Sequence, residues 1–165
     1  MALEIERRFL IKNDNWKKFI NKKIYIEQGY LSKSLDDWII RIRFTGKDFK
    51  IALKKHIESF TNFEFEYCIP RKDGETIMSN LSNTIKKERF FLEIEKKSWI
   101  IDCFKENNYP LKIAEIELSK AEEDFNLPSF LSKEITGLTY YSNFSLANNP
   151  FSQWKEDYLT TFKSN

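Results

Sequence analysis

The chain has 165 residues, and 27 Lys and Arg stand against 25 Asp and Glu, so the formal net charge is only +2. Hydrophobic residues make up 41% and aromatic residues 16%, which excludes an intrinsically disordered chain. Four Gly and four Pro exclude collagen-like and linker-rich architectures. The length predicts one domain over residues 1–165 with a core of its own.

The first residues and the cysteines predict a cytoplasmic protein. MALEIERRFL carries four charges and no apolar segment follows it, which argues against a secretory signal. No stretch approaches the roughly 18 apolar residues of a membrane span. Cys68 and Cys103 fall on strand faces that argue against pairing, and reduced thiols are typical of the cytosol.

Period-2 alternation dominates the first two-thirds of the chain. It predicts eight strands, at 3–11, 24–31, 38–45, 49–55, 62–69, 84–94, 99–104 and 111–118. The connections between them are mostly short, as at 46–48 and 96–98. We therefore expect an α+β fold of mainly antiparallel strands that close into an eight-stranded barrel.

Helical segments are predicted between and after these strands. A short surface helix is expected at 73–82 with Asp73 as its cap, and a capping box opens another at 119–122. Aromatic residues then recur at helical spacing within a C-terminal extension at 147–165, namely at Phe151, Trp154, Tyr158 and Phe162. This extension is expected to pack on the exterior of the domain, with a homodimer contact as the alternative.

One face of nearly every predicted strand carries ionisable residues, while the opposite face is apolar. The charged positions are Glu4, Glu6 and Arg8; Arg41 and Arg43; Lys54; Glu64 and Glu66; Lys87 and Arg89; Asp102; and Glu115 and Glu117. For a single strand, a solvated outer face with weak surface ion pairs would explain the pattern. Its repetition along the chain instead favours a polar lumen with an apolar exterior covered by helices.

A charged lumen is costly unless its groups are paired or bind a ligand. Carboxylates can hold a hard divalent cation, and Arg and Lys can bind an anion. Since an eight-stranded barrel has room for one small ligand, the pattern predicts a polyphosphate bound together with a metal ion.

The same residues carry a family resemblance that extends over residues 3–147. The segment at 4–10, EIERRFL, resembles the ExExK strand that opens the CYTH proteins, the triphosphate tunnel metalloenzymes. The later matches follow in the family's order: QGYL at 28–31, RIR at 41–43, LK at 53–54, EFE at 64–66, KER at 87–89, Asp102, EIE at 115–117, and the closing positions Tyr141, Asn143, Leu146 and Ala147.

The resemblance implies a tunnel that binds triphosphates with Mg²⁺ or Mn²⁺. Its members hydrolyse inorganic tripolyphosphate or thiamine triphosphate, and some are class IV adenylyl cyclases. It implies metal ligands at Glu4, Glu6, Asp102, Glu115 and Glu117, with Glu64 and Glu66 as further acidic contributors. It implies phosphate binding by Arg8, Arg41, Arg43, Lys54, Lys87 and Arg89, and catalytic roles for Glu4, Glu6 and Arg8. We expect hydrolysis of inorganic tripolyphosphate with release of orthophosphate.

Some positions depart from the family pattern. Arg8 replaces the usual Lys, and its guanidinium binds phosphate but does not lose its proton. Asn62 stands where relatives have a basic residue, and the family's extra lysines around Tyr141 and Asn143 are absent. Two alternatives therefore stay open: a class IV-type adenylyl cyclase, and a non-catalytic binder of polyphosphate or nucleotides.

Two further expectations concern the partner and the single histidine. Nucleic acid is disfavoured because the basic residues alternate with acidic ones, and a membrane partner is not expected. The partner is expected to be a small-molecule triphosphate. His56, beside Lys54 at the predicted end of a strand, is expected to be an exposed loop residue.

Overall fold

The computed structural model describes residues 3–32, 34, 37–58 and 61–154, without the side chains of residues 3, 4 and 58. The strands in these ranges are β1 (Leu3–Ile11), β2 (Ile20–Tyr30), β3 (Ile39–Phe44), β4 (Phe49–Glu58), β5 (Thr61–Ile69), β6 (Thr84–Ile94), β7 (Lys97–Phe104), β8 (Lys112–Glu117) and β9 (Leu131–Glu134). The helices are α1 (Arg71–Ser79) and α2 (Asn143–Asn148), with 3₁₀ turns η1 (Asn15–Phe19), η2 (Glu106–Asn108), η3 (Thr139–Tyr141) and η4 (Phe151–Gln153).

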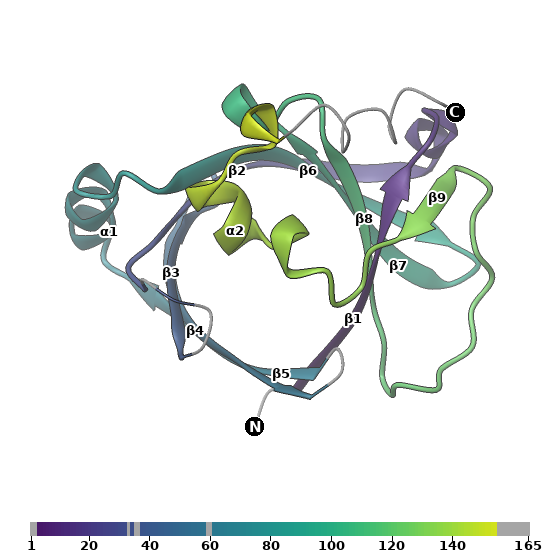
Figure 1. Cartoon of the computed structure of the whole chain (residues 1–165), viewed down its shortest axis with the longest axis horizontal. Helices are drawn as coiled ribbons and strands as arrows, with labels where there is room; N and C mark the ends of the chain where they lie inside the picture. Colours follow the sequence, from purple (N-terminus) through teal and green to yellow (C-terminus); the bar gives the residue numbers. More distant parts are fainter. Residues whose placement is uncertain (1–2, 33, 35–36, 59–60, 155–165) are drawn as a thin grey trace.

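The strands form one antiparallel sheet in the order β5-β4-β3-β2-β6-β7-β8-β1-β9. β1 also pairs with β5 through three residue pairs, between 3–5 and 61–63, and this short seam closes eight strands into a ring (Figure 1). β9 pairs with the far end of β1. The predicted closed eight-stranded antiparallel barrel is confirmed.

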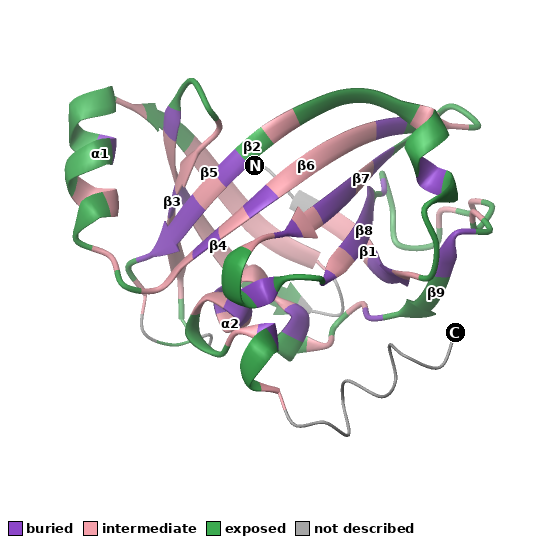
Figure 2. Cartoon of the chain, turned by 90° about the horizontal axis from the view of Figure 1, so that it is seen from above, coloured by how far each residue is buried: buried purple, intermediate pink, exposed green. Residues whose placement is uncertain are grey.

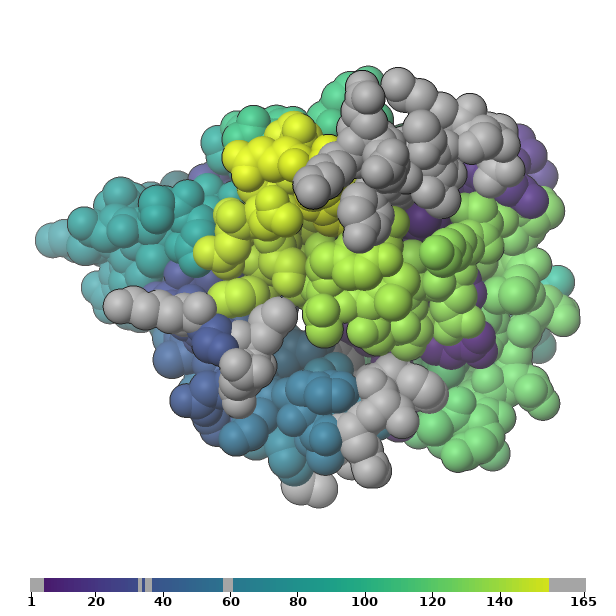
Figure 3. Space-filling view, viewed as in Figure 1, coloured from purple at the N-terminus to yellow at the C-terminus, as the bar shows by residue number. Residues whose placement is uncertain are grey.

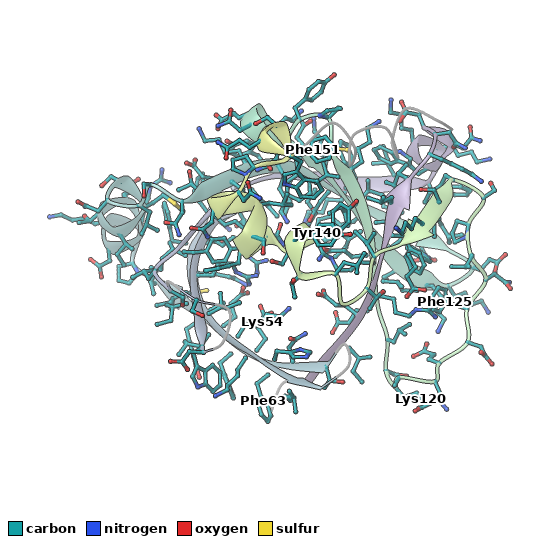
Figure 4. All side chains as sticks on the ribbon, in the orientation of Figure 1. Lys54, Phe63, Lys120, Phe125, Tyr140 and Phe151 are labelled. Atoms are coloured by element: carbon teal, nitrogen blue, oxygen red, sulfur yellow. The ribbon has the colours of Figure 1, made fainter. Side chains whose placement is uncertain are left out.

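The alternation along the strands is inverted as predicted, with charged residues inside and apolar residues outside. Figure 4 shows Lys54 of β4 pointing into the ring and Phe63 of β5 pointing away from it. On the outer face of β1, β7 and β8, Phe9, Trp99 and Ile116 are at most 2% exposed. Trp16 of η1 and residues of the β8–β9 connection cover this face. This covered outer face is therefore one of the two hydrophobic core clusters of the described residues.

One end of the barrel is closed by apolar side chains. On β1 the lumen-facing position after Arg8 is Leu10, and on β8 the one before Glu115 is Ile113, so both strands change from charged to apolar at the same end. We call this cluster the closed end; it comprises Leu10, Ile85, Phe104, Leu111, Ile113, Ile135, Tyr141, Leu146 and Phe151. Figure 2 shows α2 at this end of the strands, and Figure 3 shows the green-to-yellow segment over the ring.

Two local predictions differ from the structure, and a third falls largely outside the described residues. α1 begins at Arg71 directly after Pro70, rather than at Asp73. Residues 119–122 form a bend and a turn instead of the expected helix, although the Glu123 carboxylate accepts hydrogen bonds from the backbone and hydroxyl of Ser119. Beyond α2 the described chain contains only the short η4, and residues 155–165 of the predicted helical extension lie outside the described residues. Within the described ranges, no helix has the length and apolar character needed to cross a membrane.

Candidate active site

The barrel encloses a cavity of about 450 Å³ whose lining is rich in charge. Its volume lies within the range of small-molecule sites, about 300–1,000 Å³. The ionised side chains that line it are five cations and three carboxylates: Arg8, Arg41, Arg43, Lys54 and Arg89, with Glu6, Glu64 and Glu115. The lining therefore carries an excess of two positive charges, which favours an anion.

One wall of the cavity is built by β1, β8 and β6. Arg8 and Glu115 lie directly opposite each other in the β1–β8 pair, and Arg8 Nε donates to Glu115 Oε1 at 3.1 Å. Arg8 Nη2 also donates to the carbonyl oxygen of Tyr141 at 3.0 Å. Arg89 Nη2 donates to Glu115 Oε2 at 3.2 Å. The Glu115 carboxylate therefore separates two guanidinium groups that would otherwise repel each other.

The opposite wall is built by β3, β4 and β5. Arg41 Nη2 donates to Glu64 Oε1 at 2.8 Å, and Arg43 donates to Glu66. Burial and the neighbouring Arg41 lower the pKa of Arg43. Burial would raise the pKa of Glu66, but the hydrogen bond from Lys50 and the charge of Arg43 outweigh it, so the pKa is lowered. Glu64 lines the cavity, whereas Glu66 holds Arg43 from beside it.

Glu6 is the carboxylate that connects the two walls. Lys54 Nζ lies 3.7 Å from Glu6 Oε1 and 3.7 Å from Glu64 Oε2. Burial would raise the pKa of Glu6, but Lys54, Arg8 and other cations outweigh it, so the pKa is lowered. Glu6 is therefore ionised at neutral pH and presents oxygen ligands to the cavity.

The other predicted metal ligands are placed unequally. Glu117 is exposed and lies opposite Glu6 in the β1–β8 pair, while the side chain of Glu4 lies outside the described residues. Among the side chains that the structure describes, no group of three or more acidic, His or Cys residues is arranged to hold a metal ion. The donors of the described site are nonetheless carboxylate oxygens, the ligands that Mg²⁺ and Mn²⁺ prefer.

Lys87 and Asp102 lie behind the cavity wall rather than on it. Both are 0% exposed, and neither lines the cavity. Lys87 Nζ donates to Asp102 Oδ2 at 2.5 Å and to Asn143 Oδ1 at 3.0 Å. Burial lowers the pKa of Lys87 to about 8, although Asp102 opposes this shift. Burial would raise the pKa of Asp102, but Arg89 and Lys87 outweigh it and hold the carboxylate ionised.

Several cavity residues were not predicted as part of the site. His56 lies within β4 rather than in a loop, and its exposed ring lines the cavity with Nδ1 3.3 Å from Asn62 Oδ1. Its position two residues after Lys54 on the same strand was the available signal. Gln28 and Tyr30 of β2 also line the cavity, joined by a 2.6 Å hydrogen bond from Gln28 Nε2 to the Tyr30 hydroxyl. The residues contributed after β9, such as Thr136, carry no alternation that could have placed them.

Comparison with known proteins relates the chain to triphosphatases. No family model matches the chain. It is 31% identical over 158 residues to an inorganic triphosphatase of Acetivibrio thermocellus, and the match covers 94% of this chain and all of that protein.

Solved structures with the same fold include the inorganic triphosphatase NE1496, with a TM-score of 0.67, 24% identity, and coverage of 89% of this chain and 95% of that one. HpAC1 from Hippeastrum, an adenylyl cyclase candidate described as having a dominant triphosphatase activity, matches with a TM-score of 0.55 and 14% identity over 74% of this chain and 81% of that one. At these identities the two structures show the fold alone. With the end-to-end sequence match and the charged tunnel described above, they lead to one conclusion: the chain belongs to the CYTH superfamily, the triphosphate tunnel metalloenzymes.

Proposed function

We propose that this protein hydrolyses inorganic tripolyphosphate with the help of Mg²⁺ or Mn²⁺ and releases orthophosphate. The observation that carries the proposal is the cavity, in which five cations surround three carboxylates inside a barrel closed at one end. The relative that matches this chain end to end is itself an inorganic triphosphatase, in agreement with the predicted activity.

The cations provide the phosphate-binding wall. Arg8, Arg41, Arg43, Lys54 and Arg89 reach the cavity from four strands, so a linear polyanion inside meets positive charge on both sides. Arg43 supports this role further, because its buried Nε has no hydrogen-bond partner in the described part of the chain. An unsatisfied buried donor is unfavourable, and a phosphate oxygen is the acceptor that it lacks.

The carboxylates at the same cavity suit a hard divalent cation. Glu6 and Glu115 face the lumen, Glu117 lies opposite Glu6, and Glu4 precedes Glu6 by two residues on β1. We propose these four as the residues that hold the metal. When bound, the ion neutralises phosphate charge and makes a coordinated water more acidic.

The roles of the chain's own groups follow from charge and position. Phosphoryl transfer depends on positioning and on neutralising charge as the transition state forms. The guanidinium of Arg8 is fixed by Glu115 and Tyr141, so it is placed to stabilise developing negative charge. The closed end gives the substrate a fixed stop, which favours a short chain and cleavage at its terminal phosphate.

The proposed setting is cytoplasmic, with a small molecule as the partner. Cys68 and Cys103 are both unpaired, which agrees with a reducing compartment. A homodimer through the C-terminal extension stays a prediction.

The test is phosphate release from tripolyphosphate, thiamine triphosphate and ATP, each with Mg²⁺, with Mn²⁺ and with EDTA. We expect tripolyphosphate to be the best substrate and EDTA to abolish turnover. Cyclic AMP and pyrophosphate from ATP would instead identify a cyclase, and binding without consumption would identify a non-catalytic binder.

The acidic residues are tested by the double substitution Glu4→Gln and Glu6→Gln. It should lower metal-stimulated turnover by about 100-fold or more. Glu75→Gln is the matched control, because Glu75 is paired with Arg71 on the exposed surface of α1, outside the barrel. Unchanged turnover in the double variant would contradict the proposed metal site.

A further inference from the structure

Asp102 is a fully buried carboxylate of the barrel wall, and two cations of β6 contact it. It is directly opposite Arg89 in the β6–β7 pair. Arg89 Nε donates to Oδ1 at 2.8 Å, and Arg89 Nη2 donates to Oδ2 at 2.7 Å, so the pair is bidentate. Lys87 Nζ donates to Oδ2 as well. Both carboxylate oxygens are thus engaged by positive groups.

The surroundings of Asp102 disfavour a metal ion. Its side chain is 1% exposed and it does not line the cavity. A divalent cation brought to these oxygens would lie against two buried positive charges in a medium that screens them weakly. It would have to displace Lys87 or Arg89, and either displaced cation would then be left buried without its partner.

The same contacts orient the two cations differently. Arg89 lines the cavity, and among the described residues its Nη1 has no hydrogen-bond partner, so this nitrogen is available to a ligand. Lys87 is buried behind the cavity wall and donates to Asn143 of α2, a residue that does line the cavity, and so connects the barrel wall to α2. One carboxylate therefore sets the direction of both side chains.

We propose that Asp102 is a positioning residue and not a metal ligand: it fixes the guanidinium of Arg89 in the orientation that receives phosphate. This inference rests on the proposed function, since it assumes that the cavity binds a polyphosphate. It departs from the metal-binding role that the family resemblance implies for Asp102. The planar guanidinium gains this precision because two parallel bonds hold it in one plane.

The two roles predict opposite effects on metal-free binding. In EDTA, removing a carboxylate that only binds metal lowers the repulsion felt by a polyanion, so tripolyphosphate should bind more tightly. Removing a carboxylate that orients Arg89 should weaken the same binding. We therefore measure tripolyphosphate affinity by calorimetry in EDTA for the wild type, Asp102→Asn and Glu6→Gln.

We expect Asp102→Asn to weaken metal-free binding by about tenfold or more, and Glu6→Gln to strengthen it. In an Arg89→Gln background, Asp102→Asn should change the affinity by no more than about twofold, because the residue acts through Arg89. Affinity that is unchanged or increased in Asp102→Asn overturns the inference, and so does an undiminished loss in the Arg89→Gln background.

Folding of the variants is checked by circular dichroism. Should Asp102→Asn fail to fold, Lys87→Met/Asp102→Asn removes a buried positive charge together with the negative one, and Lys87→Met alone is its reference. The double variant should bind tripolyphosphate more weakly than Lys87→Met alone, by the same factor as Asp102→Asn relative to the wild type. A wild type that does not bind tripolyphosphate would overturn the proposed function as well, whereas a binding wild type with an unaffected Asp102→Asn overturns only the positioning role.

Discussion

Glu115→Gln tests whether the carboxylates of the lumen hold the cations apart until a phosphate arrives. Glu115 is 8% exposed and accepts one hydrogen bond from Arg8 and one from Arg89. Gln keeps one acceptor oxygen, and both guanidinium groups keep another partner, so the net loss is one charge-assisted bond. Such a bond contributes about 1.5–3 kcal/mol. For a domain of this length, the variant should melt about 3–12 °C lower.

The sign of the ligand effect is the sharper part of this prediction. With Glu115 neutralised, Arg8 and Arg89 face each other with one negative charge fewer between them, so a polyanion relieves more repulsion than in the wild type. In EDTA, tripolyphosphate should therefore raise the melting temperature of Glu115→Gln by more than that of the wild type. Thermal unfolding with and without tripolyphosphate measures both shifts.

Glu134→Gln is the matched control for this experiment. Glu134 also accepts two hydrogen bonds from an arginine, Arg7, but that pair lies on the outside of the barrel and is partly exposed. Its loss should cost less than about 1 kcal/mol and leave the ligand-induced shift unchanged. A ligand shift in Glu115→Gln equal to or smaller than the wild-type shift would refute the electrostatic reasoning.

Three further predictions concern stability. Gly74→Ala should destabilise the fold by about 1–3 kcal/mol in denaturant titrations, because the added Cβ would lie 2.2 Å from Phe49 Cγ and push α1 away from the outside of the barrel. The folded variant should keep its turnover. A variant as stable as the wild type would contradict this packing. Asn108→Ala should lower the melting temperature and speed proteolysis after α2. The buried Asn108 amide donates to the carbonyl oxygen of Leu146 at 3.1 Å and accepts from the backbone N–H of Phe151 at 2.8 Å, so its loss frees the chain around α2. Hydrogen bonds, the strongest from Lys112, lower the pKa of Asp14 from 3.8 to about 2, so the stability that Asp14 contributes is complete above pH 3.8 and is lost as the pH falls to 2. Asp14→Asn should therefore reduce the loss of stability on acidification by less than about 1 kcal/mol, measured as the free energy of unfolding against pH. The same pH dependence in the variant and the wild type would show that the ion pairs of Asp14 contribute nothing.

The barrel was predictable because alternation is a local signal that each strand carries by itself. β1 and β6 have the predicted bounds. The cavity is lined by predicted charged residues of β1, β3 and β4, namely Glu6, Arg8, Arg41, Arg43 and Lys54. β9 was missed because it is a four-residue edge strand that pairs with the end of β1. Nothing in so short a segment distinguishes a strand from a loop.

Alternation predicted the charged residues that line the cavity, but it did not predict their contacts. Alternation placed Lys87 and Arg89 on the same face, yet one is buried behind the wall and the other lines the cavity. The difference arises from Asn143 of α2, which is 56 residues away in sequence and receives a hydrogen bond from Lys87. The position of α2 at the closed end provides long-range partners of this kind, and no periodicity in the sequence predicted that position.

The short seam between β1 and β5 has a consequence for how the protein acquires activity. The ring is complete only when residues 3–5 meet 61–63, and Arg8 must also find Glu115, 107 positions further along the chain. Contacts so distant in sequence make folding slow, since much chain entropy is lost before they form. The first strand also carries Glu4, Glu6 and Arg8, so, with the roles proposed for them, a nascent chain with every other strand already paired would still be inactive. Docking of that one strand makes the barrel whole and the enzyme competent in a single event.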